Sequence, residues 1–352
     1  MSELSSRSLA DQYRRFSYRR YLWICLFAAT IIGITLFNIM SGPAGLGIWD
    51  VLKGIWSPDS LSPTDRTIIW DFRLPYSVMA ICVGACLGLA GAEMQTVLNN
   101  PLASPSTLGV LYAATLGASI AILIQAAPFG ISQNYIIPVF AFLGAITSIL
   151  MLLGVSRLFG ATADTVILFG IAMVFALQAL ISLIQFVADS DSLQQIVFWT
   201  MGSLARASWE KVFIIAAALA VCVPFSVRHM WKMTALRGGE EYAKSYGVSV
   251  DRLRLIVLLR VSVLTAVAVS FTGVIGFVGL VGPHISRLVF GEDHRFYLPG
   301  AALASAVILS GASVLSKSII PGILIPDGIV TALIGIPLFL ALLINQKRKG
   351  LV

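Results

Sequence analysis

The sequence predicts an all-α polytopic membrane protein, because nearly the whole chain consists of apolar blocks of membrane-spanning length. The 352 residues are 58% hydrophobic and only 12% charged, whereas soluble domains carry about 25% charged residues. A bilayer core requires about 20 apolar residues per helix, and only helices or closed barrels satisfy the backbone there. The blocks are too long and too continuous for barrel strands, so we expect helices.

We expect a single transmembrane domain over residues 1–352 with ten spans. The eighth span covers only about 21 Å as a helix, so it is expected to be a broken or half-depth helix. No small-residue cleavage site follows the first block, which is therefore expected to be an uncleaved span. The predicted spans are 21–40, 75–98, 106–124, 136–159, 165–187, 212–227, 255–272, 276–289, 298–315 and 328–344.

The distribution of Lys and Arg predicts the orientation. With the N-terminus inside, eighteen of the 24 basic residues fall in cytoplasmic segments, a strong positive-inside bias. This predicts that both termini are cytoplasmic, that 1–20 is a cytoplasmic segment, that 41–72 is a periplasmic loop and that 228–254 is a cytoplasmic connection. The six basic residues expected outside are Lys53, Arg66, Arg73, Arg206, Lys211 and Lys317.

Several kinds of chemistry have no sequence signal. No Gly-Lys dipeptide exists, so the chain has no Walker A loop for ATP. Its three His are dispersed and its four Cys lie inside apolar blocks without a C-x-x-C pair, which argues against a resident metal or cofactor and against enzyme activity. The net charge of +7 gathers at membrane edges, so we expect a lipid bilayer rather than nucleic acid as the basic residues' surroundings.

Carboxylates are scarce inside the predicted spans. Glu93 alone lies clearly within one, near its cytoplasmic end, where a snorkelling or helix-end carboxylate is the expected role. Carriers driven by protons or sodium usually require ionisable groups at mid-depth. This scarcity disfavours an ion-coupled secondary carrier, the alternative from another functional class.

Polar side chains form a stripe on the fifth span. Gln178, Ser182 and Gln185 are spaced i, i+4, i+7 and therefore share one helical face. Such a stripe either lines a wet path or hydrogen-bonds a neighbouring helix, and the spacing leaves both open.

Four ordered stretches, covering nearly the full length, resemble the permease family of bacterial ABC importers for iron-siderophores, haem and vitamin B12 (the FecCD type, or type II importers). The first contains Arg73-Leu74-Pro75, Val83-Gly84-Ala85, Gly91-Ala92-Glu93-Met94-Gln95, Asn100-Pro101-Leu102-Ala103-Ser104-Pro105 and Leu108-Gly109-Val110. The others are Gly276-Phe277-Val278-Gly279-Leu280-Val281-Gly282-Pro283-His284-Ile285 with Arg287, then Asp293-His294-Arg295, and Pro326-Asp327-Gly328-Ile329-Val330-Thr331-Ala332-Leu333-Ile334-Gly335-Ile336-Pro337.

The resemblance implies a subunit in the bacterial inner membrane that pairs with a second permease subunit around a central path. It also implies two cytoplasmic ATPase subunits, which hold ATP and Mg, and a substrate-binding protein outside; this chain is expected to bind no cofactor. Iron-siderophore is the expected cargo, with haem, vitamin B12 and oxyanions as alternatives. The path is expected to be lined by the fifth and tenth helices, including Gln178, Ser182, Gln185 and Thr331.

The resemblance also assigns the segment before the seventh span to ATPase contact, through short helices in residues 237–248. The coupling residues expected there are Arg237, Gly239, Glu240, Glu241, Ala243, Lys244 and Gly247.

Docking of the external binding protein is expected to involve Arg73 and Lys317. Tyr76 stands where the family has a second Arg, and Lys317 where it usually has Arg. Asp327 stands where an aliphatic residue is common; it is expected either to pair with Lys317 or to contact a cationic or metal-bearing substrate.

Overall fold

The structure, a computed structural model, describes residues 2–41, 45–125, 132–160, 162–320 and 322–348, and within these ranges it is helical and holds no strand. Each predicted span has a matching helix, so the all-α membrane fold is confirmed. The ten helices are α1 (Ser2–Met40), α4 (Leu74–Val97), α5 (Val110–Leu123), α6 (Gln133–Phe159), α7 (Ala163–Val187), α9 (Trp209–Leu236), α11 (Val250–Thr272), α12 (Val278–Phe290), α13 (His294–Ser318) and α14 (Asp327–Arg348).

Seven helical segments in the described residues are long and apolar enough to cross a membrane, and α5, α12 and the apolar part of α14 are shorter. The short α12 agrees with the half-depth helix predicted for the eighth span. The prediction that the third span starts at residue 106 was wrong. A 3-10 turn, η3 (Pro105–Leu108), and Gly109 in the left-handed region (φ +76°) delay the start of α5 to Val110.

Short helices occupy the segments between spans. The sequence analysis predicted a loop over 41–72, and the structure has short helices there instead; a short helix also lies between α7 and α9. The Asp189 side chain caps the start of α8 by accepting a hydrogen bond from the Ser192 amide at 2.8 Å. These elements are α2 (Ile48–Trp56), η1 (Pro58–Ser60), α3 (Pro63–Thr67), the π-helical η2 (Ile68–Arg73), α8 (Ser190–Thr200) and α10 (Glu240–Ser245).

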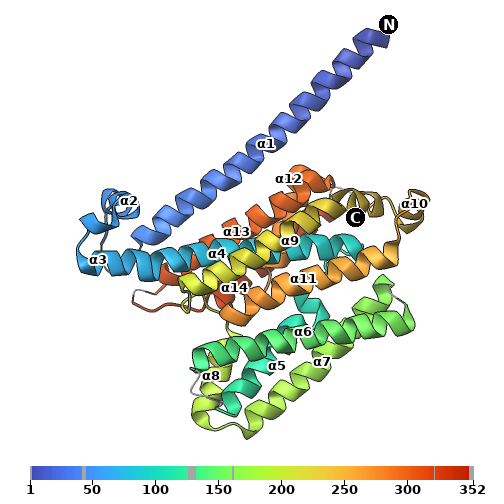
Figure 1. Cartoon of the computed structure of the whole chain (residues 1–352). Helices are drawn as coiled ribbons and strands as arrows, with labels where there is room; N and C mark the ends of the chain where they lie inside the picture. Colours follow the sequence, from blue (N-terminus) through green and yellow to red (C-terminus); the bar gives the residue numbers. More distant parts are fainter. Residues whose placement is uncertain (1, 42–44, 126–131, 161, 321, 349–352) are drawn as a thin grey trace.

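Figure 1 shows the helices as a bundle with α10 at one end and α2 and α3 at the opposite end, while α1 crosses obliquely and its first half projects away. Helices α5 to α8 form a separate layer beside α11. The most buried spans are α4 and α11, so these two form the centre of the fold.

Glycines let the central helices approach closely. A Cβ added to Gly84 would lie 2.7 Å from the Ala306 Cα atom of α13, and one added to Gly91 would collide with the Gly279 carbonyl of α12. Small residues are the usual means of close helix contact in membranes, where lipid already solvates apolar side chains. The glycines of these sequence motifs therefore allow α4 to pack closely against α12 and α13.

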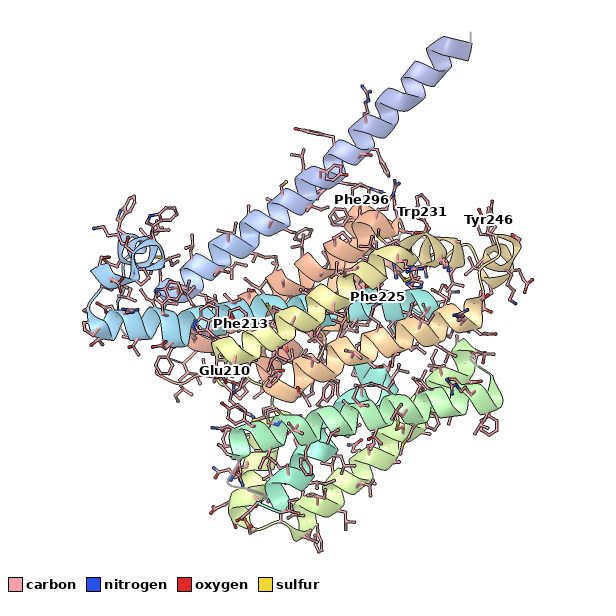
Figure 2. All side chains as sticks on the ribbon, viewed as in Figure 1. Glu210, Phe213, Phe225, Trp231, Tyr246 and Phe296 are labelled. Carbon is pink, nitrogen blue, oxygen red and sulfur yellow. The ribbon has the colours of Figure 1, made fainter. Side chains whose placement is uncertain are left out.

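Large apolar side chains cover the outer helices. Figure 2 shows Phe213, Phe225 and Trp231 following one another along α9, and their exposed fractions are 67, 52 and 69%. Exposed apolar area this extensive is incompatible with an aqueous surface and is expected for helices that face lipid or another subunit.

Candidate functional site

A hollow of about 530 Å³ lies beside α7, and all three polar residues of the α7 stripe line it. The Gln178 and Ser182 side chains are exposed and Gln185 is half-buried. None of the three side chains forms a hydrogen bond with another described residue. Of the two roles left open by the sequence, the arrangement favours a wet path.

The remaining wall of the hollow is uncharged. It combines hydroxyl groups with apolar surface from α5, η3 and the start of α12, and no charged side chain is among the described residues that line it. They are Ser104, Ser106, Leu111, Tyr112, Thr115, Ile181, Thr200, Val274, Gly276, Phe277 and Leu280.

Thr331 lies apart from this hollow. Its hydroxyl donates to the Gly328 carbonyl at 3.0 Å within α14, and the side chain is buried. Thr331 therefore does not share the hollow with the α7 stripe in this subunit, and its place on the path stays a prediction.

Phe277, which sequence reasoning did not single out, lines the hollow at the start of α12. Its backbone has φ +65°, a left-handed conformation that bulky residues rarely adopt. A Cβ added to Gly335 of α14 would lie 2.6 Å from the Phe277 Cβ. Phe277 is thus wedged between α14 and the hollow, and conformations of this kind concentrate at functional sites.

The predicted coupling segment forms the short helix α10. Gly239 and Gly247 bracket it with φ values of +109° and +75°, conformations that favour glycine. The Lys244 ammonium lies 3.0 Å from the Glu241 carboxylate on the exposed face. This ion pair raises the pKa of Lys244 above its usual value through hydrogen bonding first and charge second.

Two tyrosines make α10 an exposed aromatic surface. The rings of Tyr242 and Tyr246 lie 4.8 Å apart, and both residues are exposed. Ala243, by contrast, is buried and accepts the Val248 amide at 3.1 Å, so it anchors α10 from beneath.

A buried arginine joins α10 to the centre of the bundle. The Glu240 carboxylate lies 2.5 Å from the Arg254 guanidinium of α11, and Arg254 Nε donates to the Val97 carbonyl at the end of α4, 2.9 Å away. The Arg254 side chain is 1% exposed. We counted Arg254 from the sequence as a loop charge, and only the fold shows that it connects three helices.

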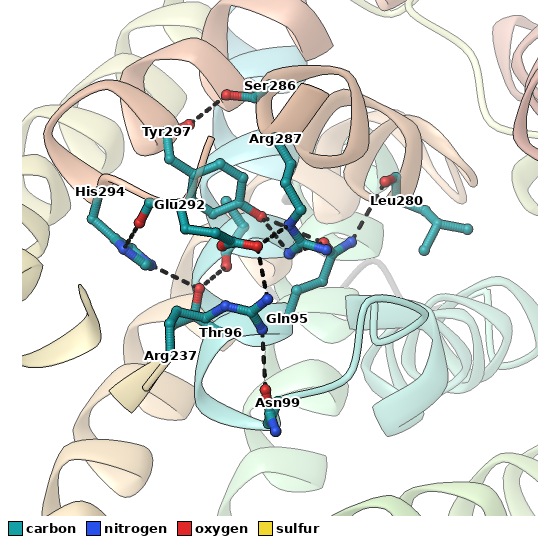
Figure 3. A network of polar contacts seen from close by, with 11 residues as sticks. Gln95, Thr96, Asn99, Arg237, Leu280, Ser286, Arg287, Glu292, His294 and Tyr297 are labelled. Carbon is teal, nitrogen blue, oxygen red and sulfur yellow. Dashed lines mark hydrogen bonds and ion pairs between the residues drawn. The ribbon is translucent and has the colours of Figure 1, made fainter. Parts of the chain in front are cut away.

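Arg237 joins the same end of the bundle to the α12–α13 turn, as Figure 3 shows. It donates to Glu292 at 2.7 Å and to Asn99 at 3.1 Å. The Glu292 carboxylate also lies 3.1 Å from Arg287 of α12, and Arg287 donates to Gln95 of α4 at 3.2 Å. We name Arg237, Asn99, Glu292, Arg287 and Gln95 the α10-end network.

His294 completes the packing beside this network (Figure 3). Its Nε2 lies 2.9 Å from the Thr96 hydroxyl and its Nδ1 lies 3.1 Å from the Thr234 hydroxyl. Both ring nitrogens are therefore occupied by protein groups that hold α4, α9 and α13 together.

Arg73 and Lys317 lie at the opposite end, where both line a second hollow of about 320 Å³. The Arg73 guanidinium donates to the carbonyls of Ile39 and Met40, at 2.5 and 3.3 Å, and so caps the end of α1. Lys317 donates to Asn38 at 2.7 Å. Both basic groups thus have structural partners, and their contact with a binding protein stays a prediction.

Asp327 forms no ion pair with Lys317 among the described residues, so the expected pairing was wrong. Its carboxylate instead accepts hydrogen bonds from the Tyr76 hydroxyl at 2.9 Å and the Leu204 amide at 2.7 Å. The Lys317 ammonium lies over the Tyr76 ring, 4.1 Å from its centroid. Tyr76 therefore separates the two charges, and the buried Asp327 is closed to a substrate in this conformation.

Glu93 is not the snorkelling carboxylate that the sequence suggested. It is fully buried and accepts two hydrogen bonds from Arg260 of α11, at 2.8 and 2.6 Å. Arg260, which the sequence count placed among cytoplasmic charges, lies well inside α11 and is 6% exposed.

Comparison with known proteins adds the family context. Residues 29–345 match the FecCD transport family. An ABC transporter permease of Methanocaldococcus jannaschii is 36% identical over 97% of this chain and 99% of its own length. The Fe(3+)-citrate import permease YfmE of Bacillus subtilis is 34% identical, covering 94% and 97%. The molybdate import permease MolB of Haemophilus influenzae is 30% identical, covering 97% and 98%.

A solved structure has the same fold. An inward-facing ABC transporter described as metal-chelate type superimposes with a TM-score of 0.80 at 30% identity, covering 92% of this chain and 98% of that one.

Proposed function

The chain belongs to the FecCD transport family and is a multi-pass ABC importer permease, and within that class we propose that it carries an iron-siderophore or related metal chelate across the bacterial inner membrane. The family consists of transport permeases rather than enzymes. In this proposal ATP and Mg are bound by separate ATPase subunits, and this chain supplies the path.

The uncharged hollow beside α7 is the observation that carries the choice of cargo. A bulky chelate must pass without being trapped, and amide and hydroxyl groups on an apolar wall offer weak, exchangeable hydrogen bonds. An oxyanion would be expected to meet Lys, Arg or backbone donors, and no basic side chain is among the described residues that line the hollow. Haem and vitamin B12 remain the alternatives within the family.

A second permease subunit is proposed to complete the path. The α7 helix leaves large apolar side chains uncovered next to the hollow; Phe175 and Leu183, for example, are 68 and 58% exposed. A partner on this face would bury them and close the hollow into a channel. The Tyr242–Tyr246 surface of α10 is proposed to contact the ATPase, and the α2 end of the bundle the external binding protein. Both termini are then cytoplasmic.

The contacts of α10 suggest how ATP binding to the ATPase subunits changes the shape of the path. A displaced α10 would move α4 through Glu240 and Arg254, and it would move α12 through Arg237 and the α10-end network. The start of α12 holds Phe277 at the edge of the hollow. Coupling requires two states with different contacts. We propose that the contact between Phe277 and Gly335 is the one that differs between these states.

An ion-coupled carrier is disfavoured by the same geometry. Glu93 is held by Arg260, and Asp327 by Tyr76 and Leu204, so neither carboxylate faces the hollow. A carrier driven by an ion gradient requires an ionisable group in the path, and no carboxylate is among the described residues that line the hollow.

Reconstitution tests this function. The permease, its ATPase and its binding protein are placed in proteoliposomes, and uptake of radioactive iron-siderophore is compared with uptake of haem, vitamin B12 and molybdate. We expect uptake of the iron chelate only with both the ATPase and ATP. Uptake by the permease alone, driven by a pH or voltage gradient, would refute the proposal, and preference for another cargo would refute its substrate.

A further inference from the structure

A basic pocket of about 460 Å³ lies between the end of α9 and the start of α11. Its walls combine three cationic side chains and one histidine with apolar surface, and no acidic side chain is among the described residues that line it. They are Phe225, Arg228, His229, Lys232, Gly247, Ser249, Arg252, Leu253 and Ile256.

The helical spacing explains why these side chains converge. Phe225, Arg228 or His229, and Lys232 recur at i, i+3 or i+4, i+7 on α9, while Arg252 and Ile256 repeat four apart on α11. Residues so spaced share one helical face, so two such faces meet at the pocket.

The Lys and Arg side chains of the pocket have no interaction partner among the described residues. Arg228, Lys232 and Arg252 are exposed and form no ion pair or side-chain hydrogen bond with another described residue. This contrasts with Arg237, Arg254 and Arg287 at the same end, each of which has a carboxylate partner. A concentration of unpaired positive charge in a concave site indicates an anionic ligand.

The depth of the pocket indicates which anion. Arg228 lies eight residues before the end of α9, or about 12 Å along the helix axis, and exposed Phe225 and Val227 precede it. Trp231, 69% exposed, follows at a position typical of the aromatic belt. The α9 wall of the pocket therefore lies more than two helical turns inside the helix end, beside an aromatic side chain of the kind that marks the headgroup region.

We propose that this pocket binds the phosphate of an anionic phospholipid of the leaflet at the α10 end, with Arg228, Lys232 and Arg252 contacting the headgroup and Phe225 and Ile256 the acyl chains. Basic pockets between transmembrane helices are a known solution for such headgroups. Because Gly247 and Ser249 also line it, a bound lipid would touch the segment that joins α10 to α11.

Native mass spectrometry of the delipidated full-length permease tests the proposal without any partner subunit. Phosphatidylglycerol and phosphatidylcholine with identical acyl chains are titrated into the protein. We expect phosphatidylglycerol to bind roughly tenfold tighter or more, since each basic group near an anionic lipid contributes about 1 kcal/mol. Equal binding of the two lipids to the unmodified protein would overturn the proposal.

Matched variants locate the site. We expect the triple variant Arg228→Gln, Lys232→Gln, Arg252→Gln to lose the preference for phosphatidylglycerol. The control variant Arg14→Gln, Arg19→Gln, Arg157→Gln removes three exposed charges elsewhere. We expect this control to keep the preference. Circular dichroism checks that both remain folded. Loss of the preference in the control as well would show a diffuse charge effect and overturn the assignment.

Two further outcomes exclude other ligands. Glycerol phosphate, which offers the same phosphate without acyl chains, is expected not to displace the lipid; full displacement would mean a soluble phosphate site instead. If the triple variant kept its lipid preference but no longer bound its ATPase, the pocket would belong to a protein contact and the lipid assignment would fail.

Discussion

The carboxylate of Glu93 and the guanidinium of Arg260 form a bidentate pair, with hydrogen bonds of 2.8 and 2.6 Å, between the two most buried spans of the protein. The two side chains are 0 and 5% exposed. Neither charge is tolerated alone in such surroundings, so α4 and α11 are held together in one register by a polar contact rather than by apolar packing alone.

Removing one member of this pair is expected to be severe, and removing both to be mild. Arg260→Met alone leaves the Glu93 carboxylate buried without its arginine partner and should destabilise the protein by about 3–5 kcal/mol. The double variant Glu93→Leu, Arg260→Met should recover most of that loss. Unfolding in detergent, followed by circular dichroism, measures both. Equal stability of the single variant and the unmodified protein would contradict the pairing.

The Glu240–Arg254 contact should matter for coupling. Glu240→Gln removes a charged partner at 2.5 Å and should lower substrate-stimulated ATP hydrolysis in the reconstituted complex roughly tenfold, the equivalent of one charged hydrogen bond. Asp251→Asn is the matched control, since Asp251 lies farther from the same guanidinium, at 3.6 Å, and is 76% exposed. Similar losses in the two variants would argue against a specific link through Glu240.

A reversal of charge on α10 is expected to go further. Glu240→Lys combined with Glu241→Lys places two cations beside Arg254 and Lys244 and should uncouple ATP hydrolysis from uptake while the protein still inserts. Basal ATPase activity and uptake are measured in the same proteoliposomes. Normal stimulation by substrate in this variant would contradict the role of α10.

Filling the hollow beside α7 should block transport. Ser182→Trp adds a large ring to a space of about 530 Å³ and is expected to abolish uptake with little change in basal ATP hydrolysis. Leu150→Trp, at a 61% exposed position on α6, is the control for the added bulk. Full uptake with Ser182→Trp would remove the hollow from the path.

Asp327 is expected to stabilise the protein rather than to bind cargo. Asp327→Asn weakens the hydrogen bonds from Tyr76 and Leu204 and should cost about 1–3 kcal/mol of unfolding free energy. Tyr76→Phe, which removes one of these donors, should cost less. If Asp327→Asn kept full stability but changed the cargo that is carried, the substrate role would be restored.

Acid should loosen the start of α13 through Asp293. Burial by itself would raise the pKa of Asp293, but hydrogen bonds and charges from Arg295 and Arg20 outweigh it and place the pKa below its usual value. The ionised carboxylate therefore contributes stability at neutral pH, which is lost as the pH falls below about 4. Asp293→Asn should flatten this acid limb of a pH–stability curve, and an unchanged limb would contradict the assignment.

The sequence by itself determined the membrane fold, the ten apolar segments, the short eighth helix and the family. Hydrophobicity and glycine placement are local properties, and a bilayer forces each apolar segment to satisfy its own backbone as a helix. The same local logic located α10, because Gly239 and Gly247 bracket a charged and aromatic patch.

Tertiary structure decided the partners of the polar side chains. Glu93 and Arg260 are separated by 167 residues in the chain, and no spacing rule connects them; the sequence therefore misplaced both, as it did the Asp327–Lys317 pair. The stripe at Gln178, Ser182 and Gln185 was ambiguous for the same reason, since one helical face is compatible with a path or with a neighbour. Which charge meets which, and which face meets open space, depends on the packing of all helices together, and that information exists only in three dimensions.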